Sequence, residues 1–349
     1  MLYPKFIWLA FLRLDLVLRE SLAASPSQDY WRSVLPDTPM PKVLHELLPT
    51  VPTLDNNHTS LTNYTGLSYN QSAMSIGINL GGIGITLGLG GLVSVSWSPF
   101  SGPNITLLPP SSPGDDSLFS YKYAAIKTQP RSNTNISLFF KEKDMFPGKK
   151  FNLCFIKTTP KTKLIPRQIA DLIPFSSTKF SEILKLFSVE SNSTNADIMS
   201  RTIEECEAEG LEGEEKNCAT SLEAQVDFST SHLGKYVRVL TTEVDKYDKE
   251  QQEYIIGQGV KILGEKIVVC HAKNYIYPIY YCHNMHQAKA YMVSLIGADH
   301  NTLKAIAICH LDTSKWNPIH LAFQVLKVKP GTIPICHFLP ESHIVWVAK

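Results

Sequence analysis

The sequence lacks an excess of charge of either sign. Its 33 lysines and arginines against 32 aspartates and glutamates leave a formal net charge of +1 over 349 residues. Proteins that bind nucleic acid or an anionic membrane surface usually concentrate basic side chains in a patch or stripe. The near-neutral balance therefore argues against nucleic acid as a partner.

Apolar runs long enough to cross a membrane, about 20 uninterrupted residues, are also missing. The apolar stretch at residues 6–18 is broken by Arg13 and Asp15. With Lys5 before it and small residues at 23–25 after it, this stretch predicts a signal peptide over residues 1–24. An ordinary buried N-terminal helix is the alternative. If the signal is cleaved, no membrane partner is expected.

A glycine-rich phosphate-binding fingerprint is absent, although the chain has 19 glycines. Glycine alternates irregularly with Ile, Leu and Val over residues 75–97, but no strand, helix and downstream acid accompany it. The apolar residues have strand character, whereas glycine makes a strand entropically costly. Residues 54–131 are rich in Ser, Asn, Thr, Gly and Pro, which predicts a loosely ordered part of a variable region over 54–136.

Sequons for N-glycosylation are concentrated before residue 200. Six Asn-x-Ser/Thr sequences occur, at Asn57, Asn63, Asn70, Asn104, Asn135 and Asn192. Their clustering is typical of a glycosylated, solvent-exposed region of a secreted protein. In an oxidising compartment the cysteines are expected to form disulfides.

Around the variable region the sequence has a globular texture. Residues 25–53 form a proline-rich segment in which Val43, Leu44, Leu47 and Leu48 follow helical spacing. From residue 137 onwards, apolar clusters at 138–140 and 151–155 predict two strands. Helices are predicted at 165–173, 180–187, 196–208 and 219–232, with Ser177 and Asn195 as N-caps and Gly210 as a stop signal.

After residue 236 the pattern changes to short segments rich in Ile, Val and Tyr, separated by turn residues. Strands are predicted within 236–244, 254–263, 266–274, 276–285, 289–297, 303–312, 320–328 and 332–338. We therefore expect one α+β domain over residues 137–349, with an antiparallel β-rich body, a helical insertion and disulfide staples.

Four of the seven cysteines are followed directly by histidine. The pairs are Cys270 with His271, Cys282 with His283, Cys309 with His310, and Cys336 with His337, separated by 10, 25 and 25 residues. Histidine fills about 3% of positions, so chance is a poor explanation for this arrangement.

Neighbouring side chains on a strand point to opposite faces of the sheet. One face is therefore expected to carry the cysteines, paired as disulfides, while the other presents the imidazoles. Four cysteines permit three connectivities, and the sequence does not choose among them.

A metal held by the histidines is one interpretation of these pairs, and histidines that merely form hydrogen bonds are the other. Zinc ligands usually come as C-x₂₋₄-C or H-x₃₋₅-H clusters, and adjacent Cys and His on a strand do not reach one ion comfortably. With the sulfurs in disulfides, nitrogen and oxygen ligands remain, which suit Cu(II).

Three cysteines lie outside the pairs. Cys206 and Cys218 bracket a charged loop between two predicted helices, so a bridge between them is expected. Cys154 is left over and is predicted to be a small buried apolar residue. His286, His320 and His343 are candidates for further ligands, although each fits an ordinary surface or packed histidine as well.

The CH-x₁₀-CH-x₂₅-CH-x₂₅-CH pattern resembles the plant BURP-domain family. The resemblance extends over residues 137–347, from LFF near the start to KPGTIPICHF near the end. DYWRSVLPDTPMPK, at residues 29–42, is similar to a short motif that follows the signal peptide in many members. The sequence is most similar to the unknown-seed-protein type, since long regular repeats ahead of the domain are missing.

Some members of this family are autocatalytic, copper-dependent peptide cyclases. The resemblance implies two copper centres with His271, His283, His310 and His337 as ligands, disulfide-stapled CH motifs, and an oxygen-requiring oxidation that links a Trp or Tyr side chain to another residue of a core peptide in the same chain. It also implies secretion to the apoplast or to a seed storage vacuole, and either an N-terminal core peptide or cell-wall components as partners.

The sequence differs from the family in the core peptide that would be its substrate. Core peptides of this type begin with Gln and end in Trp or Tyr, and no Gln lies between Gln71 and Gln129. Trp97 is the best candidate for the residue that accepts the crosslink, whereas Trp31 belongs to the N-terminal motif. A non-catalytic extracellular protein of the wall, seed or stress response is the alternative function.

Overall fold

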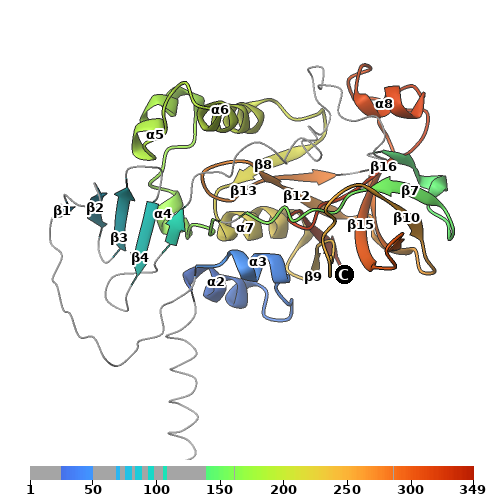
Figure 1. Ribbon diagram of the computed structural model, residues 1–349, viewed down its shortest axis with the longest axis horizontal. Coiled ribbons are helices and arrows are strands. Elements are labelled where there is room, and N and C mark those ends of the chain that lie inside the picture. Colours follow the sequence, from blue (N-terminus) through green and yellow to red (C-terminus); the bar gives the residue numbers. More distant parts are fainter. Residues whose placement is uncertain are drawn as a thin grey trace, which may run out of the picture.

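The structure is a computed structural model that describes residues 25–49, 139–160, 162–285 and 287–349, together with the backbone of five strands between residues 68 and 107. The described body is built from two antiparallel sheets and several short helices (Figure 1). This confirms the expected α+β class. None of the described helices combines the length and apolar composition that a membrane span requires.

The first sheet of the body, the seven-stranded sheet, curls on itself. In spatial order its strands are β6 (Phe140–Lys141), β16 (Ile335–Phe338), β15 (Thr302–His310), β14 (Ala288–Gly297), β10 (Gln252–Ile256) and β7 (Lys150–Leu153), with β11 (Lys261–Gly264) also paired to β14. The edge strands β6 and β7 come close, since the rings of Phe140 and Phe151 have centroids 4.9 Å apart. An apolar cluster that includes Tyr254 and Val293 fills the inside of the curl.

The second sheet, the helix-covered sheet, has five strands. Their order is β8 (Glu215–Ala219), β13 (Ile279–Met285), β12 (Ile267–Lys273), β17 (Ile344–Ala348) and β9 (Val237–Leu240). Helix α7 (Leu222–Leu233) packs on one face of this sheet, and α2 (Pro26–Val34) packs on α7 (Figure 1).

The two sheets meet through a shared apolar layer. Val269 and Val345 of the helix-covered sheet lie in one buried cluster with Ile306 and Ile308 of the seven-stranded sheet. Each strand therefore has an inner face, which turns toward the other sheet, and an outer face. This division decides where the Cys-His pairs place their side chains.

The N-terminal segment docks on the body through its short helices. Helix α3 (Lys42–Leu47) buries Leu44 and Leu47, and Trp31 of α2 lies 5.5 Å from Trp346 between ring centroids. The indole nitrogen of Trp31 donates a hydrogen bond to the Thr38 carbonyl over 2.9 Å. Burial of so large a ring with its polar atom satisfied contributes substantially to stability, so this segment is part of the folded body.

The helical insertion lies between β7 and β8. It contains α4 (Arg167–Ala170), the 3₁₀ turn η3 (Ser177–Lys179), α5 (Phe180–Leu186) and α6 (Thr194–Glu207), while a second 3₁₀ turn, η2 (Glu142–Asp144), follows β6. Both N-cap predictions are wrong. Ser177 lies within η3, which Ser176 caps, and the N-cap of α6 is Ser193 rather than Asn195, because the Ser193 hydroxyl accepts from the Ala196 amide. Helix α6 ends at Glu207, ahead of the predicted stop at Gly210.

Two expectations about the positions of helices and strands are wrong. Residues 320–328, predicted as a strand, contain helix α8 (Leu321–Leu326), because Nδ1 of His320 caps its start by accepting from the Ala322 amide and Ala322 and Phe323 enter an apolar cluster. Residues 215–219, predicted as the end of a charged loop and the start of a helix, form strand β8, which pairs with β13. Tertiary pairing overrides the low strand propensity of this charged sequence.

The variable region contains more strand than its composition predicts. Strands β1 (Ser68–Asn70), β2 (Ser75–Leu80), β3 (Ile83–Gly88), β4 (Val93–Trp97) and β5 (Ile105–Leu107) pair in order as an antiparallel sheet. The strand character of the Ile, Leu and Val residues thus outweighs the cost of the glycines.

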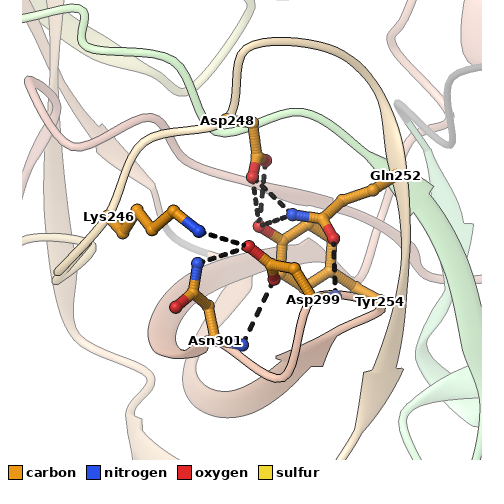
Figure 2. Close-up of polar contacts among 6 residues, drawn as sticks. All are labelled: Lys246, Asp248, Gln252, Tyr254, Asp299 and Asn301. Carbon is orange, nitrogen blue, oxygen red and sulfur yellow. Dashed lines mark hydrogen bonds and ion pairs between the residues drawn. The ribbon is translucent and has the colours of Figure 1, made fainter.

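A polar network ties the loop before β10 to the turn between β14 and β15 (Figure 2). The carboxylate of Asp248 accepts hydrogen bonds from Gln252 over 2.6 Å and from the Tyr254 hydroxyl over 2.9 Å. In the turn, Asp299 accepts from Lys246 over 3.0 Å and from Asn301 over 2.6 Å. Because every carboxylate here has close donors, the network serves to hold these loops on the sheet.

Candidate metal centre

The four CH motifs lie on four strands, which form two antiparallel pairs of neighbours. Cys270 of β12 lies directly opposite Cys282 of β13, and Cys309 of β15 lies directly opposite Cys336 of β16. Directly opposite residues on antiparallel strands bring their Cβ atoms within about 4.5–5.5 Å. Strand register alone therefore brings the sulfurs together.

Three disulfides follow from this arrangement: Cys206–Cys218, Cys270–Cys282 and Cys309–Cys336. Of the three connectivities that the sequence permitted for the CH motifs, the structure has the one that joins sequence neighbours. The bridge from Cys206 ends on strand β8 and not on a helix. Cys154 is a buried free thiol, as predicted, and burial raises its pKa.

The cysteines and the histidines occupy opposite faces of their strands, as expected from strand alternation. Cys270 and Cys282 lie in the outer cluster under α7, and Cys309 and Cys336 lie inside the curl of the seven-stranded sheet. The following residues, His271, His283, His310 and His337, turn toward the layer between the sheets, and all four are buried. Two sheets thus contribute two imidazoles each to one region.

The four imidazoles form two close pairs. Nε2 of His271 lies 3.1 Å from Nε2 of His283, and Nε2 of His310 lies 3.3 Å from Nε2 of His337. The pairs adjoin each other, since the rings of His271 and His337 have centroids 6.4 Å apart. With metal–nitrogen distances of about 2.0 Å, two nitrogens on one ion at angles near 90–110° lie about 2.8–3.3 Å apart. Both pairs have this separation.

Two further residues extend the first pair into a chain. Nδ1 of His271 lies 2.9 Å from Nδ1 of His343, in the turn before β17. On the other side, Nδ1 of His283 makes a short hydrogen bond to the carboxylate of Glu214. The sequence offered His343 only as one of several additional histidines, and it gave no signal for Glu214.

The second pair has an aromatic wall. The Trp316 ring lies 4.8 Å from that of His310 and 4.8 Å from that of His320, between centroids. Nδ1 of His320 accepts a hydrogen bond from the Ala322 amide, so the ring proton of His320 lies on Nε2. That atom is then a donor and not a ligand. The remaining candidate, His286, lies outside the described residues.

Burial favours the neutral form of His271, His310, His337 and His343. Burial lowers the pKa of His271 and His310 well below the ordinary value of 6.5, and neighbouring histidines lower it further. The pKa of His337 falls to about 4 and that of His343 to about 3, again mainly because the rings are removed from water. Neutral rings keep a nitrogen lone pair, which a metal ligand requires.

We predict that the metal-free protein loses stability as the pH falls from about 6.5 to about 4. Below the ordinary pKa of 6.5 these histidines take up protons in the unfolded chain but not in the folded protein, so acid favours unfolding. A shift from 6.5 to about 4 corresponds to roughly 3 kcal/mol for the buried His337 alone. Urea unfolding at a series of pH values measures this slope.

A matched pair of variants isolates the origin of that slope. His337→Gln removes one buried ring and should flatten the dependence of unfolding free energy on pH, whereas His300→Asn, at an exposed turn position, should leave it unchanged. Equal slopes in wild type and His337→Gln would contradict the assignment.

No group of three or more His, Cys, Asp or Glu residues in the described part of the chain is arranged to hold a single metal ion. What the described residues offer is two pairs of nitrogens. An ion bound by either pair would therefore keep coordination positions open to water or to a substrate.

Comparison with known proteins decides the family. Residues 138–348 match the BURP domain, which is the part that contains all four Cys-His pairs. The chain belongs to the BURP-domain family. The type within the family stays a prediction.

Curated BURP-domain relatives support this assignment. The chain is 53% identical over 234 residues to BURP domain protein RD22 of Arabidopsis thaliana, covering 65% of this chain and 60% of that protein. It is 48% identical over 233 residues to BURP domain-containing protein 3 of Oryza sativa subsp. japonica, covering 65% of this chain and 54% of that protein. The match thus spans little more than half the length of these two relatives.

A third BURP-domain relative matches nearly the whole chain. BURP domain-containing protein 5 of Oryza sativa subsp. japonica is 35% identical over 335 residues, covering 94% of this chain and 89% of that protein. The similarity to this relative therefore extends into the region before the BURP domain.

The other sites predicted from the sequence are the glycosylation sites, the residue that accepts the crosslink and the signal peptide. Asn192 is exposed in the turn before α6, a position open to glycosylation, and Asn70 is in β1. Trp97 is the last residue of β4, of which only the backbone is described. The other four sequons, at Asn57, Asn63, Asn104 and Asn135, and the predicted signal peptide lie outside the described residues.

Proposed function

We propose that this chain is a secreted copper-binding BURP-domain protein whose metal ligands are His271, His283, His310 and His337. One observation carries the proposal: four buried imidazoles from two sheets converge as two pairs, with Nε2 atoms 3.1 and 3.3 Å apart. Both distances suit two ligands of one ion.

The chemistry of the donor set fits copper. The CH cysteines are in disulfides, so the adjoining pairs offer imidazole nitrogen and no thiolate. Imidazole nitrogen suits Cu(II) as well as zinc, and a given nitrogen site generally binds Cu(II) more tightly, whereas soft sulfur ligands select Cu(I). Two protein nitrogens for each ion leave room for an exchangeable ligand, which suits a reactive centre more than a closed structural one.

Secretion is proposed from features that lie apart from the metal centre. The apolar N-terminal stretch, the six sequons and the three disulfides all agree with an oxidising, extracellular environment. The apoplast is the proposed location, with a seed storage vacuole as the alternative. Cell-wall components are candidate partners there.

Oxidative cyclisation of a peptide in the same chain is the proposed activity. Bound copper would supply the one-electron chemistry that side chains lack. The crosslink joins a Trp or Tyr side chain to another residue with loss of one hydrogen from each, and dioxygen accepts the two electrons and two protons. The protein's own contribution is to bury the imidazoles and to keep the pairs in fixed positions. Trp97 is the candidate acceptor.

A non-catalytic extracellular role in the wall, seed or stress response is the second candidate function. A specific observation favours it, because no Gln lies between Gln71 and Gln129 to begin a core peptide that ends at Trp97. Under this alternative the histidine pairs would bind metal without turnover, or would only form hydrogen bonds.

The experiment is a combined metal and mass measurement on the full secreted chain. We expect copper to co-purify after expression in copper-replete medium, and the intact mass to fall by two hydrogens per crosslink in air but not under nitrogen. A zinc-loaded sample serves as the redox-inactive control. Bound copper with an unchanged mass would support the non-catalytic role, and absence of copper would contradict the proposal.

A further inference from the structure

The turn between α6 and β8 places one carboxylate beside the histidine centre. Gly213 has φ of +82°, a left-handed conformation that glycine adopts without steric cost, and the Glu214 amide donates to the Leu211 carbonyl over 2.9 Å. Strand β8 then begins at Glu215, opposite Asn284 of β13. This tight turn fixes Glu214 next to the strand that carries His283.

The side chain of Glu214 points into the protein. One of its oxygens makes a short hydrogen bond to Nδ1 of His283, and the two side chains are only 8% and 1% exposed. A buried carboxylate needs a donor to offset its loss of hydration, and the ring N–H supplies one. In a neutral imidazole, a proton on Nδ1 leaves the lone pair on Nε2, the atom that His283 turns toward His271.

The loop that carries Glu214 is itself anchored. The Cys206–Cys218 disulfide closes it, and Nζ of Lys216 donates to the carbonyls of Glu205 and Cys206 over 3.2 and 3.1 Å. These contacts join the end of α6 to β8 on both sides of the turn. The third disulfide, which lies outside the CH motifs, thereby restrains the Glu214 carboxylate.

We propose that Glu214 is the positioning residue of the His271–His283 pair. Its carboxylate fixes the His283 ring with the proton on Nδ1 and directs the Nε2 lone pair toward Nε2 of His271. Its effect on metal affinity rests on the proposed copper site, whereas its effect on the tautomer does not. Carboxylate partners of this kind orient ligating histidines and raise their basicity, and their loss typically lowers metal affinity 10- to 100-fold.

The test uses the full chain and two substitutions. Glu214→Leu removes the acceptor, and Glu214→Gln keeps a neutral acceptor of the same shape. Cu(II) titration against a competing chelator should show a 10- to 100-fold loss of affinity in Glu214→Leu and a smaller loss in Glu214→Gln. The adjacent Glu215→Gln is the control, because the Glu215 side chain is 69% exposed and should not affect affinity.

A second measurement reads the tautomer without metal. Nitrogen-15 NMR of the metal-free wild type should show His283 protonated on Nδ1 and unprotonated on Nε2. If wild type bound no copper, the proposed function would fail while this spectrum still decided the role of Glu214. A proton on Nε2 of His283, or unchanged copper affinity in both folded Glu214 variants, would overturn the inference.

Discussion

Replacing His310 with alanine is expected to weaken copper binding at the His310–His337 pair by more than about 100-fold and to leave the disulfides intact. Loss of a ligand should cost more than loss of a residue that only orients one, for which 10- to 100-fold is typical. Cys309 is unaffected because it points to the opposite face of β15, into the curl of the seven-stranded sheet. Metal stoichiometry and a thiol count on the same sample measure both effects.

The matched control for this substitution is His45→Ala. His45 is exposed on α3, away from the two pairs, so copper content and thiol count should equal those of wild type. If His310→Ala retained the full copper content, His310 would not be a ligand. If His310→Ala contained more free thiols than wild type, the placement of cysteines and histidines on opposite strand faces would be wrong.

The joint substitution Cys309→Ala and Cys336→Ala is expected to destabilise the fold by about 3–4 kcal/mol. The bridge closes a sequence separation of 27 residues, and its loss restores conformational freedom to the unfolded chain. For a domain of about 200 residues this corresponds to a fall in melting temperature of roughly 10 °C. Copper affinity should fall as well, because the bridge fixes the relative positions of His310 and His337.

Cys154→Ala is the control for the joint substitution. Cys154 is also buried but forms no disulfide, so its replacement tests the loss of a small apolar side chain alone. We expect a cost of about 1 kcal/mol or less, near the centre of ordinary point substitutions. A joint variant no less stable than Cys154→Ala would contradict a structural role for the bridge.

The division between sulfur and imidazole faces was predictable from the sequence, because it depends only on the two-residue period of a strand. The disulfide connectivity was not, since it depends on which strands are neighbours and in what register. Cys270 meets Cys282 only because β12 and β13 pair with those residues opposite each other. Register of this kind is set by tertiary contacts and turn geometry.

The errors in secondary structure have a similar origin. The apolar residues within 320–328 fit the spacing of a helix or of a strand. The cap at His320 and the burial of Phe323 favour helix α8. Residues 215–219 carry charges that disfavour a strand, yet they pair along β13 and bring Glu214 to His283. A contact between residues 69 positions apart in the chain leaves no local pattern to find.

The central claim is that the cysteine sulfurs form disulfides on the strand faces that turn away from the other sheet, while the imidazoles bind copper between the two sheets. X-ray absorption spectroscopy of the copper-loaded full chain tests it most directly, because sulfur and nitrogen ligands lie at clearly different distances from the metal. The account predicts copper surrounded by imidazole nitrogen and light oxygen or nitrogen ligands, with no sulfur. A copper–sulfur shell, or no copper retained under replete conditions, would contradict it.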